Sequence, residues 1–239
     1  MVAVIDGRMP CSAKSKLCEI CEVIELPPFS ALDPRVASHP DMLLKSMNGR
    51  LFVPKDYYIE TKHEIDLIIS KTSLKLSLTN DKLGREYPLD VAYNFFTLKN
   101  AIVGNTAHIS EEIKKYALSR GFVNANVKQG YAKCSSVVLE NAVITADQGI
   151  YNTARKLGVD ALLICSGGVI LEGYDYGFLG GASGVYGNKV YFCGDISKHK
   201  DGTEISAFCQ KQGYEVISLS DAPLYDVGTL LFFCNNNHP

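Results

Sequence analysis

The chain has 239 residues, and its 24 Lys and Arg against 26 Asp and Glu give a formal net charge of −2 at pH 7. This balance excludes a protein whose main partner is nucleic acid or an anionic membrane, because either partner requires a clear basic excess. Hydrophobic residues make up 46% of the chain. That content can offset the conformational entropy lost on folding, so dominant disorder is also excluded.

The sequence predicts a cytoplasmic protein with free thiols. Its N-terminus lacks the apolar region of a secretory signal, and no stretch approaches the roughly 20 apolar residues of a membrane-spanning helix. Cys11, Cys18 and Cys21 contain one Cys-x-x-Cys, at Cys18 and Cys21, without a second pair, so no metal is expected. Residues 180–184 lack the Lys-Ser/Thr of a phosphate-binding loop, and no cofactor is predicted.

One pattern recurs five times along the chain: a strand, a tight turn, a second strand, a helix and a third strand. At the N-terminus, a strand at 2–5, a helix at 10–20 and a strand at 22–26 are expected. Complete hairpins then begin at Asp41, Asp90, Lys133 and Gly181, and a shortened one begins at Asp226. The four helices that follow are predicted at 57–70, 110–120, 151–157 and 201–212, and the third strands at 74–78, 123–127, 161–165 and 215–219. The hairpin turns are Asn48-Gly49, Lys99-Asn100, Glu140-Asn141 and Gly187-Asn188, where Asn and Gly supply positive φ angles.

The two ends of the chain complete one another. The hairpin at 226–233 lacks the rest of its unit, and residues 2–26 supply a strand, a helix and a strand. Pairing 226–233 with 2–5 closes a ring and removes its open strand edges. We therefore predict an α/β fold, a pseudo-fivefold ring of ββαβ units in one domain, 1–239. The units are 41–89, 90–132, 133–180, 181–225, and 226–239 plus 1–40. A three-layer α/β sandwich, the alternative, does not explain the complementary ends.

Such a ring resembles the pentein, or α/β-propeller, fold. That fold houses guanidino-group-modifying enzymes (arginine and agmatine deiminases, dimethylarginine hydrolases and amidinotransferases) and a ribosome anti-association initiation factor that is not an enzyme. Pro40-Asp41 is similar to the Pro-Asp that opens the first inner strand of dimethylarginine hydrolases. Asp90 stands where many of these enzymes have Gly-Gly-Asp, and Asp226 resembles the acid that opens the last inner strand.

The chain departs from this family at both catalytic positions. The resemblance implies a nucleophilic Cys shortly after the last acid, but residues 228–233 hold none and Cys234 lies beyond them. It also implies a His at the start of the third hairpin, where Tyr131-Ala132-Lys133-Cys134 stands instead. The usual thiolate–imidazole pair is therefore missing from its usual places.

Three acids are the candidate ligand-binding residues at the ring axis. If the inner strands converge there, Asp41, Asp90 and Asp226 form a crown that favours a cation, guanidinium above all. The alternative is that each Asp caps a turn. The Gly- and Tyr-rich segment 166–187 is expected to be a functional loop. It would add Glu172, Asp175 and Ser183 to the ligand site, unless it is an Ω-loop packed by its own tyrosines.

Cys134, Lys133 and His39 are the candidate catalytic residues. The Lys133 ammonium would lower the pKa of the Cys134 thiol, and His39 would carry the proton. Alternation along a strand would turn Lys133 and Cys134 to opposite faces, which favours a buried structural Cys, unless a bulge follows Gly130. His39 is alternatively a plain loop histidine.

Two functions from different classes are therefore expected. The first is a hydrolase or transferase that acts on an amidino, guanidino or other C–N bond and binds a small cation in the axial funnel. The alternative is a non-catalytic pentein that binds a ligand or a protein. No nucleic-acid or membrane partner is predicted.

Overall fold

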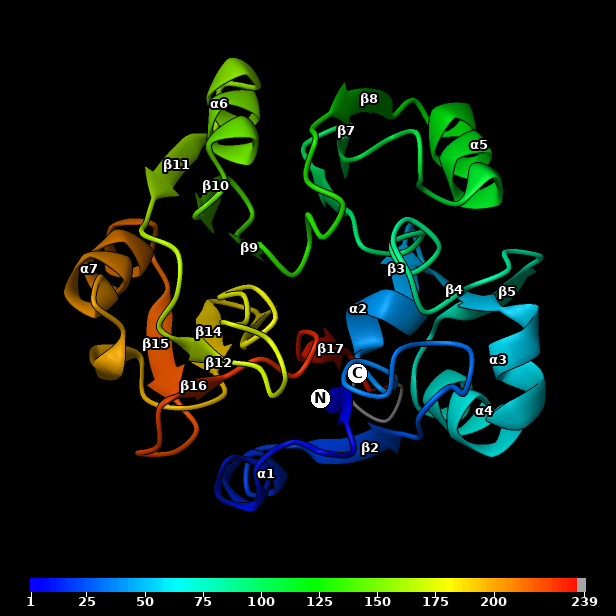
Figure 1. The fold of residues 1–239 in the computed structure, drawn as a ribbon, viewed down its shortest axis with the longest axis horizontal. Coiled ribbons are helices and arrows are strands. Elements are labelled where there is room, and N and C mark those ends of the chain that lie inside the picture. The colour runs from blue at the N-terminus through cyan, green and yellow to red at the C-terminus, as the bar shows by residue number, and fades with distance from the viewer. Residues whose placement is uncertain (236–239) are drawn as a thin grey trace.

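A computed structural model describes residues 1–235, so positions 236–239 of the predicted fifth unit lie outside the described residues. Five three-stranded sheets follow one another around a central axis, with all the helices except one short one at the rim (Figure 1). In each sheet an antiparallel hairpin is followed by a helix and by a third strand parallel to the second. The predicted ring of ββαβ units is confirmed.

The elements of the five units are as follows. The first has the one-turn helix α2 (Pro40–Leu43), then β3 (Lys45–Met47), β4 (Arg50–Pro54), α3 (Lys55–Glu60), α4 (Lys62–Lys71) and β5 (Lys75–Thr79). The second has β6 (Phe96–Leu98), β7 (Ala101–Gly104), α5 (Glu111–Ser119) and β8 (Val123–Asn126). The third has β9 (Ser136–Val138), β10 (Ala142–Thr145), α6 (Gln148–Lys156) and β11 (Asp160–Leu163). The fourth has β13 (Ser183–Tyr186), β14 (Lys189–Phe192), the 3-10 turn η1 (Ile196–Lys198), α7 (Gly202–Lys211) and β15 (Glu215–Ser218). The fifth has β17 (Leu231–Phe233), β1 (Val2–Asp6), α1 (Cys11–Cys18) and β2 (Glu22–Leu26), and β12 (Val169–Ile170) pairs with β16 (Leu224–Tyr225) in a small separate sheet.

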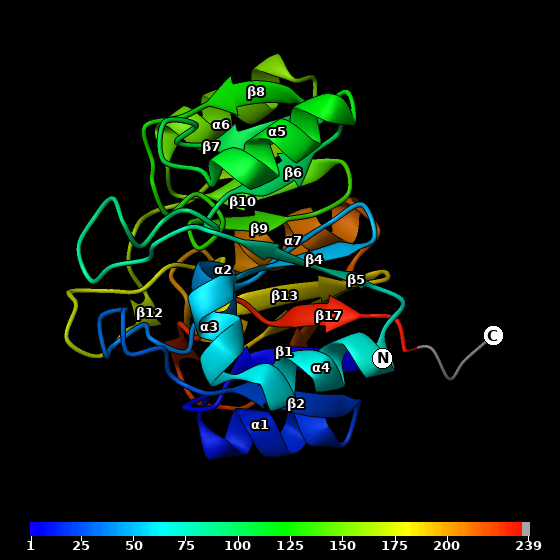
Figure 2. The same cartoon turned by 90° about the vertical axis from the view of Figure 1, so that its right-hand side faces the viewer.

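The ring closes where the two ends of the chain meet. β1 pairs antiparallel with β17, placing Val2 opposite Phe233 and Val4 opposite Leu231, and pairs in parallel with β2 on its other edge. Figure 2 shows β17 and β1 side by side. The predicted closure is therefore confirmed, and β1 is the central strand of its sheet.

The hydrophobic core is divided into five clusters, and each lies between two neighbouring units. Between the first and second units, Met47 and Phe52 pack with Phe95 and Ile113. The cluster between the fifth and first units contains Val4 from β1, so closure also buries apolar surface. Every unit therefore depends on its neighbours for burial.

The inner strands begin later than the sequence suggested. Each starts several residues after its predicted first residue: Asp41, Asp90, Lys133, Gly181 and Asp226 all precede their strands. Tight turns fill the intervening positions in several units, for example α2 and a turn in which the Ser135 N–H donates to the Tyr131 carbonyl at 2.9 Å. The side chains near the axis therefore project from turns, and strand alternation does not govern their direction.

Two smaller local predictions also differ from the structure. The helix expected at 57–70 is split into α3 and α4 at Thr61, whose hydroxyl donates to the Tyr57 carbonyl at 2.7 Å, a bond that bends helices. Asn48, Gly49 and Gly187 have the expected positive φ, but in the second turn Lys99 has it in place of Asn100, and neither residue of the Glu140-Asn141 turn does. Within residues 1–235, no helix has both the length and the apolar character needed to cross a membrane.

A double-mutant cycle across the closing strands tests the ring in solution. Val4 and Leu231 are directly opposed, so Val4→Ala and Leu231→Ala are expected to couple by about 0.2–1 kcal/mol in the free energy of unfolding, as cross-strand neighbours do. Chemical denaturation measures this coupling. The control cycle combines Val4→Ala with a substitution of the exposed Ile59, which is 67% accessible. If the effects on the free energy of unfolding add as fully in the Val4–Leu231 cycle as in this control, the closing pair does not form in solution.

Candidate functional site

Asp41 joins three units at the axis. Its backbone N–H donates to the Gly228 carbonyl at 3.0 Å. Its Oδ2 accepts hydrogen bonds from the Cys134 thiol at 3.0 Å and from the Thr229 hydroxyl at 2.7 Å. Asp41 is 2% exposed and its Oδ1 has no hydrogen-bond partner among the described residues. Its hydrogen bonds therefore connect the first unit to the third and the fifth.

Cys134 faces the axis because its turn is clamped by Asn94. The Asn94 side-chain oxygen accepts from the N–H groups of Lys133 and Cys134, at 2.9 and 3.0 Å, and its amide donates to the Cys134 sulfur at 3.0 Å. The proposed bulge after Gly130 is not needed. Asn94 is a site residue that the sequence analysis missed.

Lys133 and Cys134 line different cavities. The Lys133 ammonium lies 3.1 Å from the Thr229 hydroxyl, and the side chain lines a cavity of about 250 Å³ that also contains Ser183. Burial raises the pKa of the Cys134 thiol well above its usual range, and the carboxylates of Asp41 and Asp226 raise it further. The pKa of Cys134 is therefore raised where Lys133 was expected to lower it, because burial and two nearby negative charges act against the thiolate.

The axial cavity has a volume of about 280 Å³. Its polar wall contains Cys134, His39 and three acids, Asp90, Asp175 and Asp226. Its apolar wall is largely aromatic, with Tyr131, Tyr174, Tyr176 and Phe178 joined by Val36, Met42 and Leu171. The cavity lining thus combines carboxylates with aromatic faces, and the part of the chain that the structure describes contributes no Lys or Arg to it.

Asp90 carries an unsatisfied acceptor on this wall. Its Oδ2 accepts from the Tyr131 hydroxyl at 2.6 Å, whereas its Oδ1 is buried without a hydrogen-bond partner among the described residues. Burial raises the pKa of Asp90. Buried carboxylate oxygens are normally paired, so this oxygen marks a place for a donor.

Two backbone N–H groups donate to the Asp226 carboxylate, and a neighbouring glycine leaves space for it. The Gly228 N–H donates to its Oδ1 at 3.0 Å and the Phe178 N–H to its Oδ2 at 2.8 Å. Burial is the main reason that the pKa of Asp226 is raised. A Cβ at Gly181 would lie 2.0 Å from Asp226 Oδ1, so only glycine leaves room for the carboxylate.

The remaining predicted residues are divided between several cavities. His39 is buried, lines the axial cavity, and places Nε2 3.7 Å from the Asp6 carboxylate. Asp175 is exposed at the rim of the axial cavity. Glu172 lines a neighbouring cavity beside Arg8, and Ser183 donates to the Gly180 carbonyl at 3.1 Å, away from the axial cavity.

Asp41 lies beneath the thiol and does not line the axial cavity, so the predicted crown of three acids is reduced to Asp90 and Asp226.

Two further residues near the axis escaped the sequence analysis. Thr229 has φ +73°, a strained value for a β-branched residue, and its hydroxyl bridges Lys133 and Asp41. Lys45 donates to the Phe95 carbonyl, and burial together with the Lys133 charge lowers its pKa to about 7.

No group of three or more His, Cys, Asp or Glu side chains in residues 1–235 is placed to hold a metal ion.

Comparisons with known proteins agree with this fold. A family model described as "Family of unknown function (DUF6873)" matches residues 4–231. No curated protein matches the sequence. Among solved structures, a DDAH from Pseudomonas aeruginosa complexed with citrulline matches with a TM-score of 0.54 and 11% identity, over 92% of this chain and 91% of that one. An agmatine deiminase from C. jejuni matches at 0.51 and 11%, over 92% and 75%, and an amidinotransferase from Microseira wollei at 0.50 and 10%, over 92% and 88%. At these identities the likeness establishes the pentein fold alone.

The raised thiol pKa gives a reactivity order that can be measured. Without a ligand, Cys134 should react with iodoacetamide at neutral pH more slowly than the exposed Cys11, Cys18, Cys165 and Cys234. The thiolate is the reactive form, so labelling of Cys134 should rise only at alkaline pH. Peptide mass spectrometry after timed alkylation would contradict this if Cys134 were labelled first.

Proposed function

We propose that this chain, which belongs to the DUF6873 family of unknown function, binds a small molecule with a guanidinium, amidinium or ammonium group in its axial cavity. Asp90 Oδ1 carries the proposal, because it is a buried acceptor without a partner on the cavity wall. A cationic N–H donor would satisfy this oxygen and pair with its charge.

The rest of the cavity supports a cation. Asp226 and the exposed Asp175 add two carboxylates to its lining. The aromatic rings in the same lining favour positive charge through their π faces. The similar structures include a C. jejuni agmatine deiminase with its substrate bound, which accords with a small-molecule site in this fold.

Asp90→Asn should weaken cation binding. Loss of a charged hydrogen bond costs about 1.5–3 kcal/mol, or about 10- to 150-fold in Kd. Asn keeps one oxygen for the Tyr131 hydroxyl and removes the negative charge that pairs with the cation. Calorimetric titration with agmatine, arginine and simple amidines measures the change in Kd, and denaturation checks that the variant is folded. The exposed Asp221→Asn is the control, and an unchanged Kd in Asp90→Asn would contradict the proposal.

The raised pKa values of Asp90 and Asp226 set the sign of two pH dependences. The folded protein retains these protons to a higher pH than the unfolded chain, whose carboxyls titrate near about 4. The contribution of these groups to stability therefore falls as pH rises from about 4 through the raised values. Cation affinity should change in the opposite direction, weakening as pH falls through the same range. Titrations at several pH values check this, and affinity independent of pH would count against the two acids as ligands.

We further propose that the bound cation reacts at Cys134, and the hydrogen bond from its thiol to Asp41 Oδ2 at 3.0 Å favours this second function. In the empty cavity the thiol is protonated, since its pKa is raised. A cation beside the sulfur lowers that pKa, so that the nucleophile forms when a substrate is present. Cys134 lines the cavity from the third unit and His39 from the fifth. The family resemblance places its thiol in the fifth unit and its imidazole in the third, so the two groups come from the same two units with their places exchanged.

The reaction follows from these positions. The thiol proton passes to Asp41, and the sulfur electron pair forms an S–C bond to the amidinium carbon, giving a neutral tetrahedral adduct. A nitrogen lone pair then re-forms the C–N double bond while the bond to the departing amine breaks, and that amine takes up the proton. Water or a second amine then attacks the same carbon and gives a proton to Asp41, the C–S bond breaks, and the sulfur takes that proton back as the thiol. In hydrolysis the remaining positive charge leaves as a second proton, which the released amine accepts, and in transfer it stays on the new amidinium group.

Trapping of the S–C intermediate tests this chemistry. S-methylisothiourea can lose methanethiol, so it should leave one amidino group on Cys134, detected as a mass gain on that peptide. Cys134→Ser should abolish the adduct, while binding of unreactive cations stays within about threefold because the acids remain. Cys165→Ser is the matched control. If cations bind but no adduct forms at Cys134, the chain is a binding protein and the catalytic proposal fails.

A further inference from the structure

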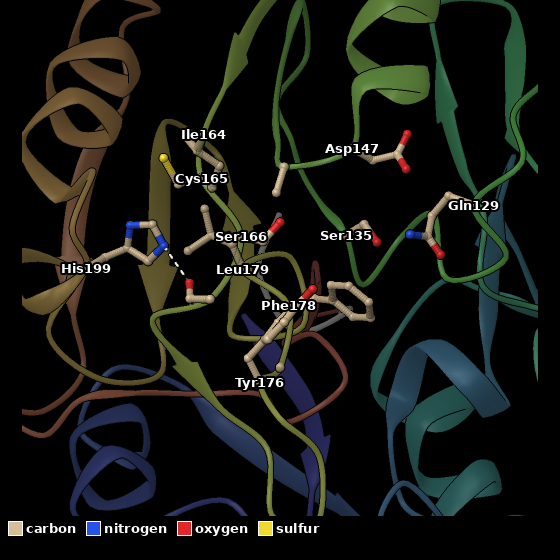
Figure 3. Close-up of a pocket in the computed structure, with 13 residues that line it drawn as sticks. Gln129, Ser135, Asp147, Ile164, Cys165, Ser166, Tyr176, Phe178, Leu179 and His199 are labelled. Carbon is tan, nitrogen blue, oxygen red and sulfur yellow. Dashed lines mark hydrogen bonds between the residues drawn. The ribbon is translucent and has the colours of Figure 1, made fainter.

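A second cavity lies between the third and fourth units, with a volume of about 240 Å³ (Figure 3). Its polar lining includes Gln129, Ser135, Asp147, Cys165, Ser166 and His199. Tyr176 and Phe178 line both this cavity and the axial one, so the two share a wall. We refer to it as the lateral cavity.

Ser135 provides an unsatisfied group in the lateral cavity. The residue is 5% exposed, and its hydroxyl has no hydrogen-bond partner among residues 1–235. In Figure 3 the amide end of Gln129 points toward Ser135, and no hydrogen bond joins them. Buried hydroxyls are normally bonded, so the pair can accommodate a polar group of a ligand.

His199 shapes the lateral cavity but has no free ring nitrogen to offer. The Asp201 N–H donates to Nδ1 at 3.1 Å, which leaves Nε2 as the donor to the Gly167 carbonyl at 3.0 Å. A Cβ at Gly168, where φ is +78°, would lie 2.7 Å from the imidazole. The neutral ring thus holds the 166–168 loop in place, and the ligand must be recognised by other groups.

Among residues 1–235, Asp147 is the only carboxylate lining the lateral cavity, and no Lys or Arg of this range lines it. Its Oδ1 accepts from the Ile150 N–H at 2.8 Å and so caps the N-terminus of α6. Its Oδ2 makes no hydrogen bond with the described residues. One unopposed negative charge beside neutral donors and acceptors is complementary to a molecule with one amine and one hydroxyl or amide.

We propose that the lateral cavity is a second binding site, for a small hydroxylated or amide-bearing primary amine. Its ammonium group pairs with Asp147, and its neutral polar group bonds to Ser135 and Gln129. The site is separate from the axial cavity and does not require the axial proposal to hold.

Cys165 gives a direct readout, because it is exposed and lines this cavity. Ethanolamine should slow the alkylation of Cys165 by iodoacetamide in a saturable way, without affecting Cys11 or Cys18. Ethylene glycol, which lacks the charge, and ethylamine, which lacks the hydroxyl, should protect less. No protection by ethanolamine, or equal protection by ethylene glycol, would overturn the proposal.

Variants separate the lateral site from the axial one. Asp147→Asn keeps a side chain suited to begin α6 but should weaken protection about tenfold or more, and Ser135→Ala about threefold to tenfold. Asp195→Asn, which alters an equivalent cap at η1, should have no effect. Asp90→Asn should leave Cys165 protection unchanged. If Asp90→Asn removes the protection, or Asp147→Asn retains it fully, the amine does not bind in the lateral cavity.

Discussion

The arrangement of the axis depends on one buried carboxylate. A charge as deeply buried as that of Asp41 requires hydrogen-bond donors, and the donors come from Cys134 in the third unit and Thr229 in the fifth. The buried residues of each apolar cluster come from two neighbouring units, whereas this carboxylate also links the first unit to the third, which is not adjacent to it. The orientation of the thiol is therefore part of the packing of the ring, as well as the origin of its proposed chemistry.

The axis also separates charges of opposite sign. Asp90 and Asp226 line the axial cavity, and Lys133 lines the cavity that contains Ser183. A nearly neutral chain thus contains a cavity with an acidic lining. A cation that enters it meets carboxylates and aromatic rings, with Asp41 and Thr229 lying between it and the lysine.

The ring could be predicted from the sequence because its signals are local: hairpin turns, helix caps and two incomplete ends. The axial groups could not, since their direction depends on where each inner strand starts. Leu43, Asn94, Cys134, Gly181 and Thr229 each stand two residues before an inner strand, and this equivalence would have identified Asn94 and Thr229. The sequence analysis began the strands at the acids instead. It therefore placed Asp41 in the cavity, although contacts from distant units hold it beneath the thiol.

The pairing of β1 with β17 has a consequence for biosynthesis. A ribosome delivers β1 first and β17 only after the four intervening units have been made. Throughout that interval the nascent chain carries β1 with one unpaired edge, a condition that invites pairing with other chains. The closing contact is also among the most distant in sequence, and such contacts form slowly. This edge therefore stays open to pairing with other chains until residues 231–233 leave the exit tunnel and occupy it.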